Sequence, residues 1–237
     1  MHRQTARIAG ALYLLSAVTA GLPLIYVSAA LIVPADATKT AGNILASEGS
    51  FRACMVSELI GAITFIFVVR ALYQLLAEVS KTQASLMVTL VLISVPITFL
   101  NVLNEVAALR LLHGDSFLGV VTGAQRDALA LLFLNLHGDG VSLANIFWGL
   151  WLFPFGALVI RSGFIPRILG VLLLLNGVAL IVVSLTALTF PAHLDSVSRY
   201  ATLPELGELW MIGWLLIKGV RPFNSATNSP NLPPRAT

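Results

Sequence analysis

The chain has 237 residues, of which 57% are hydrophobic and 11% are charged, and its mean hydropathy is +0.90. An average soluble domain is about 25% charged, so this composition excludes a water-soluble globule and is typical of a membrane protein. The net charge of +3 is small and dispersed, which excludes a nucleic-acid-binding protein, and the single cysteine, Cys54, excludes an internal disulfide.

Six segments are apolar over about the 20 residues that a helix needs to cross the hydrocarbon core of a bilayer. In chain order they are residues 8–33, 53–76, 86–112, 141–160, 165–190 and 206–220. They predict an all-α, polytopic transmembrane helix bundle that forms one domain over residues 1–221. Residues 222–237 are rich in Pro, Asn and Ser and are predicted to form a disordered tail.

Three of these spans contain a proline, at Pro23, Pro96 and Pro154. Neighbouring helices can satisfy the carbonyl that a proline leaves free, so we expect kinks rather than breaks. The first span is far longer than the 7–15 apolar residues of a signal-peptide core, so we expect an uncleaved helix there.

Two of the segments that connect the predicted spans are expected to form helices of their own or to extend a span. Residues 36–52 predict a short outer amphipathic helix after the first span, carrying Ile44, Leu45 and Phe51. Residues 124–138 are apolar enough to enter the membrane and directly precede the fourth span. They form either an interfacial helix or an outward extension of that span.

The basic residues favour an orientation with both chain ends in the cytoplasm, where Lys and Arg are enriched. In that arrangement nine basic residues fall inside: Arg3, Arg7, Arg70, Lys81, Arg161, Arg167, Lys218, Arg221 and Arg235. Five fall outside: Lys39, Arg52, Arg110, Arg126 and Arg199. The predicted topology is therefore N-in and C-in.

Polar side chains within the spans gather in the half of the membrane that this topology places outside. Ionisable residues at such depth are costly and indicate function by default. Counted at 1.5 Å per residue from the inner basic residues, Glu58 lies about 18 Å up, Glu208 roughly 15–20 Å and Asn145 about 24 Å. By the same count His137 lies about 36 Å up, at the outer rim.

Asn101, Asn104 and Glu105 lie about 30–36 Å up by this count, and their i, i+3, i+4 spacing places them on one helical face. The sequence thus predicts an outward-facing polar pocket for a small molecule, a cation or a proton. Its predicted lining is Glu58, Asn101, Asn104, Glu105, His137, Asn145 and Glu208.

Each of these residues also has a purely structural interpretation. Asparagines in spans often join helices by hydrogen bonds, and a buried glutamate can be protonated. If Glu58 and Glu208 face each other, they can share a proton. The tryptophan pairs 148/151 and 210/214 are more typical of packing than of a cofactor site, and we expect neither a cofactor nor a metal.

Several blocks carry a resemblance to a known family: "RIAGALYLL", "NILASEGSFR", "LNLHGDG" with "FWGLWLFPFGALVIRSGFIPRILGVLL", and "LPELGELWMIGWLLIKGV". Over residues 7–220 the chain resembles a bacterial multi-pass membrane family, domain of unknown function 4386. The resemblance implies a multi-pass protein of the bacterial inner (plasma) membrane and no particular activity. It also implies an acid at Glu58, a Leu-His pair at Leu136 and His137, and a Gly-Glu pair at Gly207 and Glu208, whereas Asp139 departs from the family pattern.

Three functions are compatible with these residues. The first is a binding or transport protein that takes a small molecule or ion from the outer side. The second is a membrane-embedded enzyme acting on a lipid-like substrate, with His137 as base or metal ligand and Glu58 or Glu208 as its partner. The third is an accessory membrane protein whose polar residues only fix helix packing.

The first of these functions is favoured over the enzyme. Zinc sites usually draw on several His or Cys ligands, whereas the membrane region has one histidine. The chain also contains neither the metalloprotease motif H-E-x-x-H nor the hydrolase motif G-x-S-x-G. The expected partners are the lipid bilayer and a small ligand or ion, not nucleic acid, and the sequence does not decide the oligomeric state.

Overall fold

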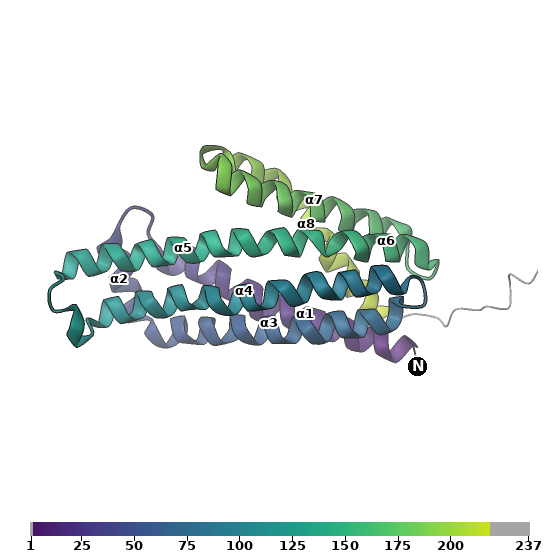
Figure 1. Cartoon of the computed structure of the whole chain (residues 1–237), viewed down its shortest axis with the longest axis horizontal. Helices are drawn as coiled ribbons and strands as arrows, with labels where there is room; N and C mark the ends of the chain where they lie inside the picture. Colours follow the sequence, from purple (N-terminus) through teal and green to yellow (C-terminus); the bar gives the residue numbers. More distant parts are fainter. Residues whose placement is uncertain (1, 219–237) are drawn as a thin grey trace, which may run out of the picture.

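The computed structural model describes residues 2–218 as helices joined by short turns, without a strand in that range (Figure 1). The α-helices are α1 His2–Tyr26, α2 Ala37–Ala46, α3 Glu48–Leu76, α4 Lys81–His113, α5 Gly123–Leu150, α6 Leu152–Ser162, α7 Arg167–Thr189 and α8 Leu194–Ile217. Three short helical turns complete the set: the π-turn Val27–Leu31 that continues α1, and the 3₁₀ turns Ser116–Leu118 and Pro191–His193. The predicted all-α bundle is confirmed, and the predicted tail, residues 222–237, lies outside the described residues.

Five helical segments are long and apolar enough to cross a membrane, and they correspond to the first five predicted spans. They are Arg3–Leu31, Glu48–Leu76, Lys81–His113, Gly123–Ser162 and Arg167–Thr189. The sixth prediction falls on α8, which begins at Leu194, but only its part Leu206–Ile217 is apolar. That part is shorter than the ~20 residues of a full span, so six crossings stay a prediction.

The two described ends of the chain lie at the same end of the bundle (Figure 1). Gly10 near the start of α1 packs against Leu215 and Leu216 near the end of α8. The turns over residues 77–80 and 163–166 lie at this end as well (Figure 1). An even number of crossings requires this arrangement, while the side of the membrane on which this end lies stays a prediction.

The segment that left two alternatives open, residues 124–138, extends the fourth span. α5 and α6 form an almost continuous helix of 40 residues, about 60 Å long. It is interrupted only at Trp151, three residues before Pro154. Proline has no N–H and its ring crowds the carbonyl four residues earlier, which explains a break at this point. Helices α1 and α4 continue through Pro23 and Pro96, as expected.

The short helix after the first span is α2, and it is shorter than predicted. Asp36 caps it, since its carboxylate accepts a hydrogen bond from the backbone N–H of Lys39 at 2.9 Å. Ile44 is buried as expected, but Leu45 is exposed, and Phe51 is a buried residue of α3. α3 begins at Glu48, earlier than the predicted residue 53, because a single residue, Ser47, separates it from α2.

The core of the bundle consists of two apolar clusters at different heights. The first includes Ala9, Leu72, Met87, Phe155 and Leu215, near the end that carries both chain ends. The second includes Leu31, Phe51, Leu109, Ala130 and Leu134, toward the other end. Most of the buried polar side chains lie in the helical segments between these clusters, in a region that we call the polar layer. They include Ser16, Glu58, Ser94, Thr98, Asn101, His137 and Asn176.

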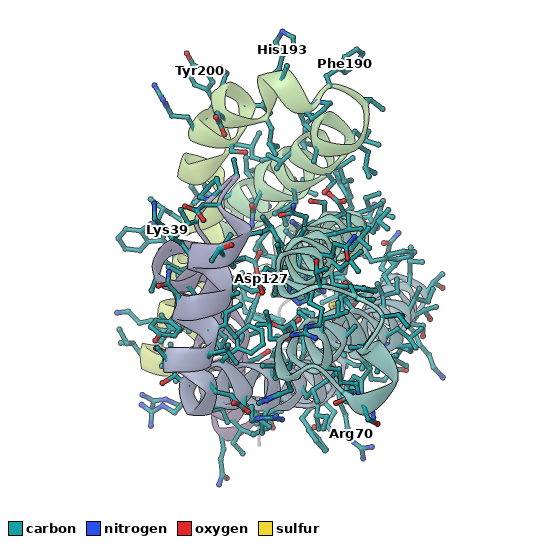
Figure 2. The ribbon with its side chains drawn as sticks, turned by 90° about the vertical axis from the view of Figure 1, so that its left-hand side faces the viewer. Lys39, Arg70, Asp127, Phe190, His193 and Tyr200 are labelled. Atoms are coloured by element: carbon teal, nitrogen blue, oxygen red, sulfur yellow. The ribbon has the colours of Figure 1, made fainter. Side chains whose placement is uncertain are left out.

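Helix α7 contacts the long helix of α5 and α6 through paired glycines. A Cβ on Gly149 would lie 2.7 Å from the carbonyl oxygen of Gly177, and a Cβ on Gly156 would lie 2.7 Å from that of Gly170. Small residues allow this close backbone approach, as is common between membrane helices. Beyond the glycines, α7 and α8 diverge from the other helices toward Phe190, His193 and Tyr200 (Figure 2).

Candidate functional site

Three buried ionisable side chains from three helices meet in the polar layer. His137 on α5 places Nε2 3.3 Å from Glu58 Oε2 on α3 and 4.0 Å from Glu105 Oε2 on α4. The side chains of His137, Glu58 and Glu105 are only 9%, 5% and 3% exposed. Charged groups are rarely buried to this degree unless they are paired or bind an ion. We call these three residues the His137 cluster.

Two asparagines fix the position of this cluster on α4 and α5. Asn101 donates a hydrogen bond from Nδ2 to the backbone carbonyl of His137 at 2.9 Å. Asn104 donates in turn to Oδ1 of Asn101 at 3.1 Å. The predicted shared face of Asn101, Asn104 and Glu105 therefore points into the bundle, where two of its members are buried.

The predicted depths of His137 and Glu58 cannot both be right, because the two residues touch and therefore lie at one level of the bundle. His137 is a buried residue rather than an exposed rim residue, while Asp139 is exposed. The count for Glu58 began at Arg70, but α3 continues six residues further, to Leu76. This difference corresponds to about 9 Å, or about half of the mismatch between the two depths.

Glu208 belongs to a separate network. Its carboxylate accepts a hydrogen bond from the hydroxyl of Tyr13 on α1 and another from Nδ2 of Asn176 on α7, the latter at 2.7 Å. Three helices are joined in this way. Tyr13 was not predicted as a site residue. The position of this tyrosine within the first span was a usable signal, because the hydroxyl of a buried tyrosine usually needs a hydrogen-bond partner.

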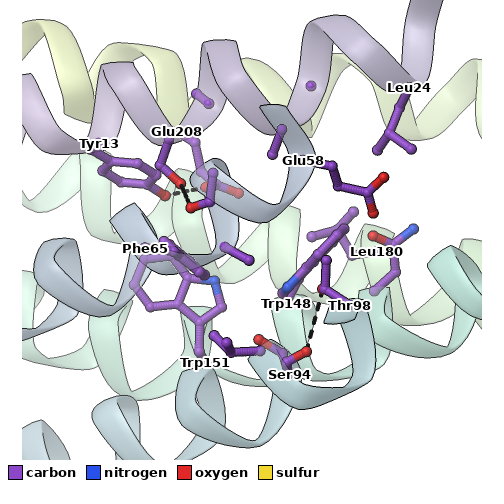
Figure 3. Close-up of a pocket in the computed structure, with 18 residues that line it drawn as sticks. Tyr13, Leu24, Glu58, Phe65, Ser94, Thr98, Trp148, Trp151, Leu180 and Glu208 are labelled. Atoms are coloured by element: carbon purple, nitrogen blue, oxygen red, sulfur yellow. Dashed lines mark hydrogen bonds between the residues drawn. The ribbon is translucent and has the colours of Figure 1, made fainter. Parts of the chain in front are cut away.

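A central cavity of about 400 Å³ lies between these two groups, and both Glu58 and Glu208 line it. Glu208 lies beside Tyr13 at one side of the cavity, and Glu58 lies toward Leu24 at the other (Figure 3). Four aromatic residues form much of its wall: Tyr13, Phe65, Trp148 and Trp151. The ring centroids of Phe65 and Trp151 are 5.1 Å apart with an edge-on geometry, so this wall is tightly packed.

The rest of the lining is neutral. Ser16, Ser94, Thr98 and Asn145 contribute polar atoms, and the other residues are apolar. No Lys, Arg or His is among the described residues that line the cavity. Asn145 therefore lines the central cavity and lies apart from the His137 cluster.

A smaller cavity of about 220 Å³ adjoins the His137 cluster and is lined by all three of its residues, together with Pro23, Val27 and Leu134 among others. Glu58 lines both cavities. The seven predicted site residues are thus divided. Five belong to the His137 cluster and its two asparagines, whereas Asn145 and Glu208 lie on the central cavity.

The tryptophans also divide. Trp151 is fully buried and packs on Phe155, as a structural interpretation predicts, yet Trp148 and Trp151 both line the central cavity. Trp210 is exposed on α8. No metal was expected from the sequence, but one carboxylate oxygen from each glutamate and a nitrogen of His137 lie within 4.8 Å of one another. This closeness and this choice of donors match the ligand set of a metal ion.

Five apolar helices of spanning length around a buried polar layer define a helical, multi-pass membrane protein. The chain belongs to the family described as domain of unknown function (DUF4386), whose model matches residues 8–219. The predicted family membership is thereby confirmed. No curated protein and no solved structure matches this chain.

Proposed function

We propose that this protein binds a small organic cation with an apolar body in the central cavity. The observation that carries the proposal is the composition of the lining. Two carboxylates, Glu58 and Glu208, and four aromatic rings face a cavity whose described lining includes no basic side chain. A volume of about 400 Å³ is within the ~300–1,000 Å³ range of small-molecule sites.

The chemistry of this lining favours a cation over an anion or a neutral molecule. An anion would face two acidic groups and no positive partner. A neutral alkyl chain can use the aromatic wall but not the carboxylates. An ammonium group can use both, because the face of a tryptophan or tyrosine ring attracts a cation and a desolvated contact of this kind contributes about 2 kcal/mol.

The proposal is for binding from the outer side of a bacterial plasma membrane, with both chain ends in the cytoplasm. The excess of basic residues near that end supports this orientation. The packing at the same end supports binding rather than an open pore. Leu75, Leu76, Met87 and Leu158 are buried there in the first apolar cluster.

A matched set of three probes tests the proposal: octyltrimethylammonium, octanol and octanoate, each titrated into the purified protein in detergent. Quenching of tryptophan fluorescence reports binding, because Trp148 and Trp151 line the cavity. We expect the cation to bind at least tenfold more tightly than the alcohol and the carboxylate not to bind. The fluorescence change should be smaller in Trp148→Phe, which retains Trp151 as a reporter.

The controls use other carboxylates of the chain. Glu58→Gln and Glu208→Gln should each weaken binding of the cation, whereas Glu78→Gln at an exposed position should leave it unchanged. Equal affinity for the three probes would refute the proposal. If no probe binds and the glutamine variants only lower thermal stability, the polar groups serve helix packing alone.

A further inference from the structure

We infer that Glu58, Glu105 and His137 form a binding site for one divalent transition-metal ion, of the kind represented by Zn²⁺ and Mn²⁺. The three ligands come from α3, α4 and α5, which are the helices that face one another across the polar layer. Metal sites in helical bundles are commonly built from such inward-pointing carboxylates and histidines on facing helices. The inference does not depend on the identity of the ligand in the central cavity, although Glu58 lines that cavity as well.

The spacing of the donor atoms suits an ion of this size. Ligands at ~2.1 Å from a tetrahedral ion lie about 3.4 Å from one another. His137 Nε2 and Glu58 Oε2 are 3.3 Å apart, and His137 Nε2 and Glu105 Oε2 are 4.0 Å apart. A side-chain adjustment of roughly half an ångström would bring Glu105 to the ideal distance from His137. All three donor atoms, including those of the two glutamates, lie within 4.8 Å of one another.

Two of the donor atoms point into the cluster without a hydrogen-bond partner. Glu105 Oε2 and His137 Nε2 are both fully buried, and neither makes a hydrogen bond of good geometry, although Nε2 lies within ion-pair distance of Glu58 Oε2. Buried polar atoms in folded proteins are nearly always satisfied, so each exception requires an explanation. A metal ion at the centre of the cluster would coordinate both atoms.

Charge gives a second reason for an ion at this position. Two carboxylates within 4.8 Å of each other in a buried environment repel, and one imidazole compensates for at most one of their charges. A divalent cation neutralises both carboxylates and leaves the histidine neutral, which is the form that coordinates metals. No Lys or Arg belongs to the described lining of the adjoining cavity.

Three protein ligands leave coordination positions open, and the structure provides room for them. The cavity of about 220 Å³ beside the cluster is lined by all three ligands, and a water molecule needs only about 30 Å³. Three protein ligands with an open position are the pattern of metal sites that exchange water or bind a further ligand. Asn101 holds α4 against α5 at this point through the carbonyl of His137.

The direct test is metal binding by the purified protein. Protein stripped with a chelator is dialysed against Zn²⁺, Mn²⁺ or Mg²⁺ and its metal content is measured by elemental analysis. We expect about one Zn²⁺ or Mn²⁺ per chain, little Mg²⁺, and a rise in melting temperature with the bound ion. X-ray absorption of the Zn²⁺ form should show one imidazole nitrogen among oxygen ligands.

Variants then locate the ion. His137→Ala and Glu105→Gln should each weaken binding at least tenfold. His193→Ala, at an exposed histidine, and Glu208→Gln, at a carboxylate outside the cluster, should retain it. Failure of the wild-type protein to retain metal after dialysis would overturn the inference, and so would unchanged binding by the folded Glu105→Gln variant.

Discussion

The side-chain amide of Asn101 on α4 occupies the space that a Cβ on Gly140 of α5 would need. The two helices therefore meet here with only a hydrogen between the glycine backbone and the asparagine. This contact allows Asn101 to reach the carbonyl of His137 three residues earlier on α5. A glycine inside a helix is thus required by the position of a polar side chain on the neighbouring helix.

Replacement of Gly140 tests this relationship. Gly140→Ala should displace the amide of Asn101, break its bond to His137 and lower the free energy of unfolding by about 1–3 kcal/mol. Gly138→Ala is the matched control, because a Cβ on Gly138 meets nothing within 4 Å and alanine favours a helix by about 0.5–1 kcal/mol over glycine. Reversible unfolding in detergent measures both, and equal stability of the two variants would contradict the structure.

The glycine pairs between α7 and the long helix permit a second prediction. In Gly156→Ala the new methyl group would meet the carbonyl oxygen of Gly170 at 2.7 Å, so the helices must separate. We expect a loss of about 1–3 kcal/mol. Gly213→Ala on α8 has open space around it and should not lower the stability. Thermal unfolding of the two variants compares them directly.

The hydrogen bond from Tyr13 to Glu208 should appear as a coupling energy between α1 and α8. In a double-mutant cycle, Tyr13→Phe and Glu208→Ala should couple by about 1–3 kcal/mol, as expected for a bond to an ionisable acceptor, because alanine leaves the hydroxyl without that acceptor. Tyr26→Phe on the same helix is the control, since it lies thirteen residues away, about 20 Å along α1. Additive effects of Tyr13→Phe and Glu208→Ala would show that the bond does not form.

The cap of α2 should depend on pH. The backbone N–H of Lys39, followed by its side chain, lowers the pKa of Asp36 below its ordinary value of 3.8. Because the pKa is lower in the folded state, the cap contributes its full stability to α2 at pH values above the ordinary pKa. This stability is lost as the pH falls through the folded-state pKa.

Hydrogen exchange of the α2 amides measures this loss. Once corrected for the intrinsic rate, protection should decrease on acidification in the wild-type protein but not in Asp36→Asn, whose amide oxygen caps the helix without titrating. The same acid-dependent loss in Asp36→Asn would rule out this carboxylate as the cause.

The sequence predicted the apolar helices well because their signal is local. A run of about 20 apolar residues specifies a spanning helix wherever its neighbours lie. The boundaries were less accurate where the boundary depends on neighbouring elements, as at α3, which starts directly after Ser47 and includes Phe51. The extension of the fourth span over residues 124–138 was one of two readings that composition alone could not separate.

The polar groups were identified by residue type but not by grouping. Glu58, Glu105 and His137 stood out as ionisable residues in apolar segments, yet depth counting assigned His137 to an exposed rim. The count depends on one basic residue per helix, and Arg70 does not mark the end of α3. Which polar residues meet depends on helix rotation and pairing, which no single segment encodes.

Two features of the structure were not predicted from the sequence. Tyr13 looked like one more aromatic residue in an apolar span, and only the fold shows that its hydroxyl reaches Glu208. The glycine pairs between α7 and its neighbour are spaced by seven residues on both partners, Gly149 and Gly156 against Gly170 and Gly177. This antiparallel match is visible only after the two helices are known to pack.

Glu58 lines both the central cavity and the smaller cavity beside His137, so one carboxylate belongs to two compartments. An occupant that binds Glu58 in one compartment would change the charge or the rotamer that this side chain presents to the other. Thermodynamic reciprocity then fixes the relation between the two occupants. If an ion at His137 changes the affinity for a cavity ligand by some factor, that ligand changes the affinity for the ion by the same factor. A single side chain would thereby couple the two proposed sites.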